Sequence, residues 1–258
     1  MKWLILTTGH LPEAHVMADF LLRQSQDVAL FNIKRRPRSQ SLAVLKRLAK
    51  KRGLVYLADL LLGRRFRKLY LDPAVKIFPN MTEDVVADIQ RRCRTVDIDD
   101  PHGEETIHQV SQIGPDYILL LGAPVVKPAL FTLARQGTLN WHHGLSPGYR
   151  GSDCVLWAMA RNEFDQIGFT IHSVSEVVDG GKIILQRAVP VRKDLDFSEA
   201  IADVARRGMD GFLEVVGRIL SKQELEFTAQ EKGGTHYPPI GFRAIRRAHG
   251  NYRKYAGR

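Results

Sequence analysis

A continuous apolar segment, Tyr117–Leu121, is the feature that most constrains how this chain can fold. It lies between a Pro-Asp pair and a Gly-Ala-Pro sequence, and such short segments are typical of a central parallel strand covered on both faces. Further strand-like segments alternate with helical ones along the chain: Trp3–Thr7, Val28–Ile33, Thr95–Ile98 and Gly137–Trp141. We therefore predict an α/β fold, an open, mostly parallel, twisted sheet with helices on both faces.

Composition limits the class of protein further. The chain has 258 residues, of which 44% are hydrophobic and 26% charged, enough for one medium domain with an appendage. Two cysteines, Cys93 and Cys154, indicate neither a disulfide framework nor a metal cluster. No apolar run approaches the ~20 residues of a membrane-spanning helix, and the apolar run after Lys2 is too short for a signal peptide. We expect a cytoplasmic protein.

The net charge of +10 is distributed unevenly. Residues 34–68 carry a net +12 and residues 241–258 a net +6, so the remainder is acidic, at −8. We expect residues 1–220 to form the catalytic domain, with a basic helical insert at 34–70, and residues 221–258 to form a basic C-terminal extension that is extended or a small addition. The insert has leucines at near-helical spacing, which predict amphipathic helices: Leu42, Leu45, Leu48, Leu54, Leu57, Leu60 and Leu61.

Such basic helices have two possible arrangements. They can bind an anionic membrane surface, or they can pack on their own domain. Nucleic acid is disfavoured, because only Tyr56 and Phe66 interleave aromatic rings with the cations of the insert. A helix pair or a tail hairpin could also make a homodimer.

Polar residues gather where the predicted strands end. Alternation places Asn140 and His142 on one face of a strand, and Thr170 and His172 on one face of another. An Asp179-Gly-Gly turn follows. A lone strand histidine is more often a hydrogen-bonded core residue, and a lone Asp-Gly is usually only a turn. His142 and His143 point to opposite faces of a strand, so we expect no metal site.

Taken together, these residues resemble the folate-dependent formyltransferase family. Residues 168–186 read G-F-T-I-H-S-V-S-E-V-V-D-G-G-K-I-I-L-Q, similar to the family pattern G-x-T-x-H-x-V…D-x-G-x-I-x-x-Q. The upstream pattern N-x-H…L-x-P-x-x-R-G is matched by Asn140, His142, Leu145, Pro147, Arg150 and Gly151. The resemblance covers residues 116–191 strongly. It implies a Rossmann-like formyltransferase fold and an N-formyltransferase that uses N10-formyltetrahydrofolate, without a metal.

The resemblance also implies residue roles. Asn140, His142 and Asp179 would be catalytic, with Asn140 and a protonated His142 binding the developing oxyanion. The Asp179 carboxylate would raise the pKa of His142. His172 would orient the site by hydrogen bonding, beside Thr170, and Tyr149 and Arg150 would bind substrate. The folate pocket would be lined by two loops. The first comprises Leu121, Gly122, Ala123, Pro124, Val125 and Val126, and the second is Ser175–Asp179, with Ser175 and Val178 in contact with the folate.

The resemblance implies that the acceptor is a primary amine, and members of the family differ in which amine they use. Residues 7–12, T-T-G-H-L-P, lack the phosphate loop of members acting on glycinamide ribonucleotide. Residues 221–258 are too few for the barrel domain of members acting on methionyl-tRNA. We therefore expect a nucleotide-linked amino sugar, of unspecified sugar and base, and a role in polysaccharide biosynthesis. Three other acceptors remain alternatives: methionyl-tRNA, glycinamide ribonucleotide and a siderophore precursor. A non-catalytic basic binding protein on this fold is a further alternative.

Overall fold

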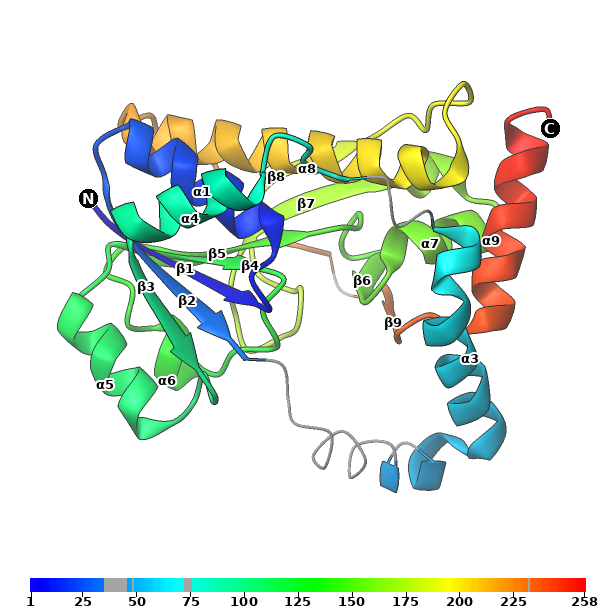
Figure 1. Cartoon of the computed structure of the whole chain (residues 1–258), viewed down its shortest axis with the longest axis horizontal. Coiled ribbons are helices and arrows are strands. Elements are labelled where there is room, and N and C mark those ends of the chain that lie inside the picture. Colours follow the sequence, from blue (N-terminus) through cyan, green and yellow to red (C-terminus); the bar gives the residue numbers. More distant parts are fainter. Residues whose placement is uncertain (35–45, 48, 72–75, 232) are drawn as a thin grey trace.

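The computed structural model describes residues 1–34, 46, 47, 49–71, 76–231 and 233–258, and within them a seven-stranded sheet forms the centre (Figure 1). The strand order is β3-β2-β1-β4-β5-β7-β8. The first five of these strands are parallel, and β7 and β8 are antiparallel to their neighbours. The bounds are β1 (Lys2–Thr8), β2 (Asp27–Ile33), β3 (Arg94–Ile98), β4 (Tyr117–Leu121), β5 (Gly137–His142), β7 (Gly168–Ser173) and β8 (Ile183–Ala188). The predicted mostly parallel α/β sheet is confirmed.

Helices cover both faces of the sheet (Figure 1). One face packs against α1 (Pro12–Arg23), α4 (Glu83–Arg92) and α8 (Phe197–Leu220), and the other packs against α5 (Glu104–Ile113) and α6 (Pro128–Phe131). The ends of two helices follow from their caps. Thr82 accepts a hydrogen bond from the Val85 N–H to begin α4, and Asp196 and Glu199 form a capping box at α8.

A second group of elements follows the carboxyl end of strand β5. There β6 (Tyr149–Gly151) pairs in parallel with β9 (Thr235–Tyr237). Along the chain, β6 is followed by α7 (Cys154–Arg161) and the short 3₁₀ helix η1 (Phe164–Gln166). The C-terminal helix α9 (Phe242–Tyr255) packs between α7 and α3 (Leu54–Tyr70) (Figure 1).

The sequence left two alternatives for the C-terminal residues, an extended tail or a small addition, and in the structure residues 242–255 form a packed helix. This helix buries four residues at helical spacing: Ala244, Ile245, Ala248 and Tyr252. They belong to the same core as the face of the sheet that α1, α4 and α8 cover. The domain division at residue 220 stays a prediction. The expected helix over Leu54 to Leu61 is present as α3, whereas the one expected over Leu42, Leu45 and Leu48 lies mostly outside the described residues.

The topology brings the polar strand ends together. Because β7 runs antiparallel beside β5, Asn140 lies opposite His172 and His142 lies opposite Thr170. The loop after β4 begins beside the end of β5, because the carboxyl ends of these two parallel strands meet at one edge of the sheet. In the part of the chain that the structure describes, every helix is too short or too polar to cross a bilayer.

Candidate active site

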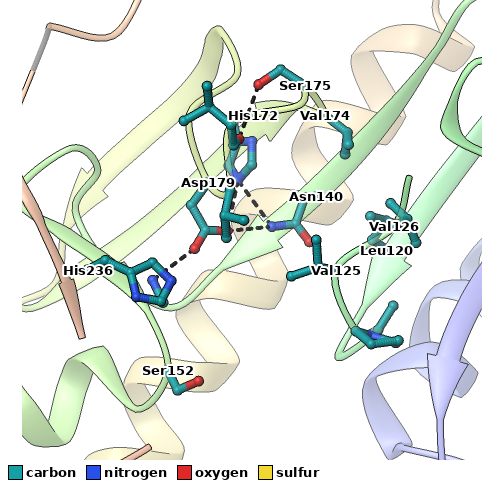
Figure 2. Close-up of a pocket in the computed structure, with 15 residues that line it drawn as sticks. Leu120, Val125, Val126, Asn140, Ser152, His172, Val174, Ser175, Asp179 and His236 are labelled. Carbon is teal, nitrogen blue, oxygen red and sulfur yellow. Dashed lines mark hydrogen bonds and ion pairs between the residues drawn. The ribbon is translucent and has the colours of Figure 1, made fainter. Parts of the chain in front are cut away.

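Asn140, His142, His172 and Asp179 form one polar cluster, as Figure 2 shows for three of them. The Asn140 amide nitrogen Nδ2 lies 3.1 Å from His172 Nε2 and 3.4 Å from Asp179 Oδ1. His142 Nδ1 lies 3.6 Å from Asp179 Oδ2. The structure therefore brings together the three residues predicted to be catalytic and the histidine predicted to orient them. Their chemical roles stay predictions.

The hydrogen bonds of the two histidines fix which nitrogen carries the proton. His142 Nε2–H donates to the Tyr149 carbonyl at 2.7 Å, so Nδ1 of the neutral ring has a lone pair that faces Asp179. His172 Nδ1–H donates to the Ser173 carbonyl at 2.8 Å, which leaves Nε2 to accept from Asn140. His172 thus orients the Asn140 amide, and His142 can take up a proton at Nδ1.

Charge and burial oppose each other in this cluster. Burial disfavours a charge on Asp179. The imidazolium forms that His172 and His142 take at acidic pH, together with the Gly151 N–H, outweigh burial and lower the pKa of Asp179 to about 2. Burial lowers the pKa of His142 even though the Asp179 charge and the Tyr149 carbonyl act to raise it. The sequence expectation of a raised His142 pKa is therefore wrong, because desolvation is the larger effect, and the resting ring is neutral.

Three hydrogen bonds hold the Asp179 turn. Asp179 adopts a left-handed conformation, φ 51°, and its Oδ2 accepts a hydrogen bond from the Gly151 N–H at 2.8 Å. The Gln230 amide Nε2 donates to the carbonyls of Asp179, at 2.8 Å, and Gly181, at 2.7 Å. Gly151 itself has φ 92°, and a Cβ there would lie 2.3 Å from the Tyr237 carbonyl oxygen. Only glycine fits this position without moving β9.

The predicted neighbours of the cluster have other contacts. Thr170 Oγ1 donates to the Gly144 carbonyl at 2.6 Å and accepts from the Ser146 N–H at 3.1 Å, so it holds the loop after His142. His143 stacks on Trp141, with ring centroids 4.0 Å apart, and burial lowers its pKa to about 4. Within the described residues no group of three or more potential ligands is placed to hold a metal ion.

Tyr149 and Arg150 were predicted to bind substrate, and the structure places both in the scaffold. Tyr149 is buried and stacks on Tyr237, with centroids 4.8 Å apart, and its hydroxyl donates to Glu163. Burial raises the pKa of Tyr149. Arg150 donates from Nη2 to Gln230 Oε1 at 3.0 Å. Neither residue lines either of the two cavities described next, so a substrate contact by them stays a prediction without support from this placement.

Two cavities meet at the cluster. The valine cavity, of about 340 Å³, lies beside Asn140, His172 and Asp179, with Val125 and Val126 across from them (Figure 2). Its wall includes most of the residues predicted to bind folate: Ala123, Pro124, Val125, Val126, Ser175 and Val178. Leu121 is instead fully buried in the core and Leu120 takes its place, because side chains alternate along β4; Gly122 lines the second cavity.

The second cavity, of about 390 Å³, lies on the other side of the cluster, and we call it the Arg67 cavity. Asn140, Asp179, Ala123 and Gly151 line both cavities. The Arg67 cavity adds His142 and an ion pair between Arg67 of α3 and Asp153, whose Nη2 and Oδ1 atoms are 2.9 Å apart. Its remaining wall is largely apolar and includes Leu71, Ile77, Val155, Leu156, Ile201 and Ala205.

Comparison with known proteins identifies the family. A family model described as formyl transferase matches residues 73–216, more than half of the chain. The chain belongs to the formyl transferase family. A methionyl-tRNA formyltransferase of Chlorobium chlorochromatii is 33% identical over 126 residues, which is 49% of this chain and 39% of that protein. The chain thus spans well under half the length of this curated relative of the family.

Solved structures of this family share the fold. Glycinamide ribonucleotide transformylase 1 from Symbiobacterium toebii gives a TM-score of 0.58 at 14% identity, covering 90% of this chain and 94% of that one. An N-formyltransferase from Helicobacter canadensis, in complex with folinic acid and dTDP-3-aminofucose, gives 0.56 at 15% identity, covering 92% and 70%. At these identities the likeness shows the fold alone, the Rossmann-like formyltransferase fold expected from the sequence.

The site residues that were missed from the sequence include three with polar side chains. Gln230 clamps the Asp179 turn, His236 of β9 lines the valine cavity and Arg67 of α3 lines the second one. All three come from the segments that the sequence assigned to an insert and an extension. The only sequence signal for Arg67 was the basic character of the insert, and this did not indicate that Arg67 would pair with the distant Asp153.

Proposed function

We propose that this chain transfers a formyl group from N10-formyltetrahydrofolate to a primary amine. The observation that carries the proposal is the meeting of two cavities at Asn140 and Asp179, with His142 in the wall of the second. A group-transfer enzyme must hold its donor and its acceptor together in a reacting geometry beside its catalytic groups. Membership of the formyl transferase family supports this reading of the site.

The valine cavity suits the folate donor. Its wall combines valine side chains with backbone of the two loops after β4 and β7, which offers an apolar slot with polar groups at its edge. A flat pterin ring has the matching chemistry, and the Helicobacter canadensis relative was solved with folinic acid. The donor supplies a formyl group on nitrogen N10, and the protein residues supply hydrogen bonds and a proton acceptor.

Each residue of the cluster has one task in this proposal. Asn140 Nδ2 donates to the formyl oxygen as it becomes negative, replacing its longer contact, 3.4 Å, with Asp179. Neutral His142 accepts at Nδ1 the proton that the attacking amine loses, and the Asp179 carboxylate, 3.6 Å away, stabilises the resulting imidazolium. That proton then goes to the departing folate nitrogen. The products are a formamide and tetrahydrofolate.

For the acceptor, we favour the amine of a nucleotide-linked amino sugar, bound in the Arg67 cavity. Arg67 places a cation at that cavity, where a diphosphate would be attracted to it. The Helicobacter canadensis relative was solved with dTDP-3-aminofucose. A role in polysaccharide biosynthesis would follow from such a substrate. Methionyl-tRNA is the second candidate acceptor, because curated relatives of this chain are methionyl-tRNA formyltransferases.

A formyl-transfer assay tests the proposal. The chain is incubated with N10-formyltetrahydrofolate and one amine at a time: a nucleotide-linked amino sugar, glycinamide ribonucleotide or methionyl-tRNA, with formamide product read by mass spectrometry. We expect His142→Ala to lose about 100-fold or more in turnover, whereas His108→Ala, an exposed histidine on α5, keeps it. Failure to bind folinic acid and to formylate any of these amines would contradict the proposal.

A further inference from the structure

Helix α3 presents an apolar stripe to solvent. Nine large hydrophobic side chains are exposed among the described residues, and five of them lie on this one helix: Leu54, Val55, Leu61, Leu62 and Leu69. Leu54 and Leu69 are 75% and 66% exposed. With a period of 3.6 residues, these positions fall along one side of the helix. We call these five residues the α3 stripe.

The opposite side of α3 is fixed to α9. A Cβ on Gly63 would lie 2.8 Å from the backbone nitrogen of Phe242, so the two helices touch at that point. Asp59 Oδ1 accepts from the Arg243 N–H at 3.0 Å in the first turn of α9, which has no side-chain cap of its own. Because these contacts and the buried Leu60 lock the helix, the α3 stripe cannot turn inward without breaking them.

Cations flank the α3 stripe. A groove of about 620 Å³ runs between α3 and α9, which lie side by side (Figure 1), and its wall joins Val55 and Leu62 to Arg243 and Arg246. Arg64 and Arg65 are exposed on α3 itself, and exposed Lys50, Lys51 and Arg52 precede it. The acid in the groove, Asp59, is engaged with α9.

We propose that the α3 stripe and its flanking cations dock this protein on an anionic membrane surface. An amphipathic helix with aliphatic residues between basic ones inserts its apolar side among acyl chains, while the cations meet anionic headgroups. A second copy of the chain fits less well, because the arginines along the groove would face the same arginines of that copy. RNA fits less well, because it would leave the aliphatic stripe uncovered. The docking surface does not depend on the formyl-transfer proposal.

The test is sedimentation of the full chain with vesicles. Vesicles of phosphatidylcholine mixed with phosphatidylglycerol are compared with vesicles of phosphatidylcholine alone, across a salt series. We expect binding to the anionic vesicles that weakens with salt. The double variant Leu61→Gln with Leu62→Gln should lose about tenfold or more in partitioning, while Phe227→Gln, an exposed aromatic residue away from α3, should bind as the wild type does.

The cations are tested separately. Arg64→Gln with Arg65→Gln should weaken binding to anionic vesicles, and exposed Lys222→Gln should not. Circular dichroism and size-exclusion chromatography show that each variant is folded and report its oligomeric state. Wild-type protein that stays in the supernatant, binds neutral vesicles equally well, or is unaffected by the stripe variant would overturn the proposal. So would a dimer that the stripe variant dissociates without any vesicle binding by the wild type.

Discussion

Replacing Gln230 should slow formyl transfer although this side chain need not touch either substrate. Its amide donates to the carbonyls of Asp179 and Gly181, at 2.8 and 2.7 Å, and its oxygen accepts from Arg150 at 3.0 Å. Two neutral hydrogen bonds and one to a guanidinium contribute about 2.5–6 kcal/mol together. Without them, the left-handed Asp179 turn is held chiefly by the Gly151 N–H and its contacts within the cluster.

The size of the effect follows from geometry. Displacing a catalytic group by about 1 Å costs about 100-fold in rate, or about 2.7 kcal/mol, which lies within what the three bonds supply. We therefore expect Gln230→Leu to lower kcat about 100-fold while the KM for the folate donor changes by less than about threefold. Steady-state kinetics measure both constants, and a thermal melt shows that the variant is folded.

Two further variants make the Gln230 prediction specific. Gln230→Glu keeps an acceptor for Arg150 but removes the donor to the two carbonyls, so it should be as slow as Gln230→Leu. Gln223→Ala, an exposed glutamine of the same segment, should have wild-type kinetics. Wild-type kcat in a folded Gln230→Leu protein would refute the positioning argument, and wild-type kcat in Gln230→Glu would refute the role of the carbonyl contacts.

The remaining predictions concern the polar cluster around Asp179 and the valine cavity. Asp179→Asn removes the charge that acts to raise the pKa of His142, so that pKa should fall further in a histidine NMR titration; an unchanged value would contradict the coupling. The Asp179 pKa is about 2 in the fold against 3.8 when unperturbed, so ionised Asp179 stabilises the fold by about 2 kcal/mol at neutral pH. This contribution should be lost as the pH falls from about 5 toward 2, and urea unfolding of Asp179→Asn should lack that part of the pH dependence. Val178→Trp fills the valine cavity and should raise the KM for the folate donor at least about tenfold, and an unchanged KM would place the donor elsewhere.

Local sequence signals were sufficient for most of the sheet. The run Tyr117–Leu121 forms β4, buried between helices on both faces, and the leucine spacing over residues 54–61 forms part of α3. These features depend on residues close in sequence, so the pattern alone predicts them. The spacing of Ala244, Ile245 and Ala248 also carries a helical pattern, but Gly233-Gly234 and Pro238-Pro239 just before it left both an extended tail and a small addition open.

Long-range contacts account for what the sequence did not predict in the site. Gln230 lies 51 residues after Asp179, and Arg67 lies 86 residues before Asp153, so no local motif joins either pair. The pKa of His142 is shifted in the opposite direction from the expectation for a similar reason. A motif shows the neighbouring carboxylate but not the degree of burial, which here is the larger effect.

A crystal structure with folinic acid tests the central claim most directly. We predict that the pterin occupies the valine cavity, between Val125 and Val178, and that the formyl oxygen lies within hydrogen-bond distance of Asn140 Nδ2. The side of the formyl group away from the pterin should open into the Arg67 cavity, toward His142. A ligand bound at any other place, or a formyl group remote from Asn140, His142 and Asp179, would contradict the account.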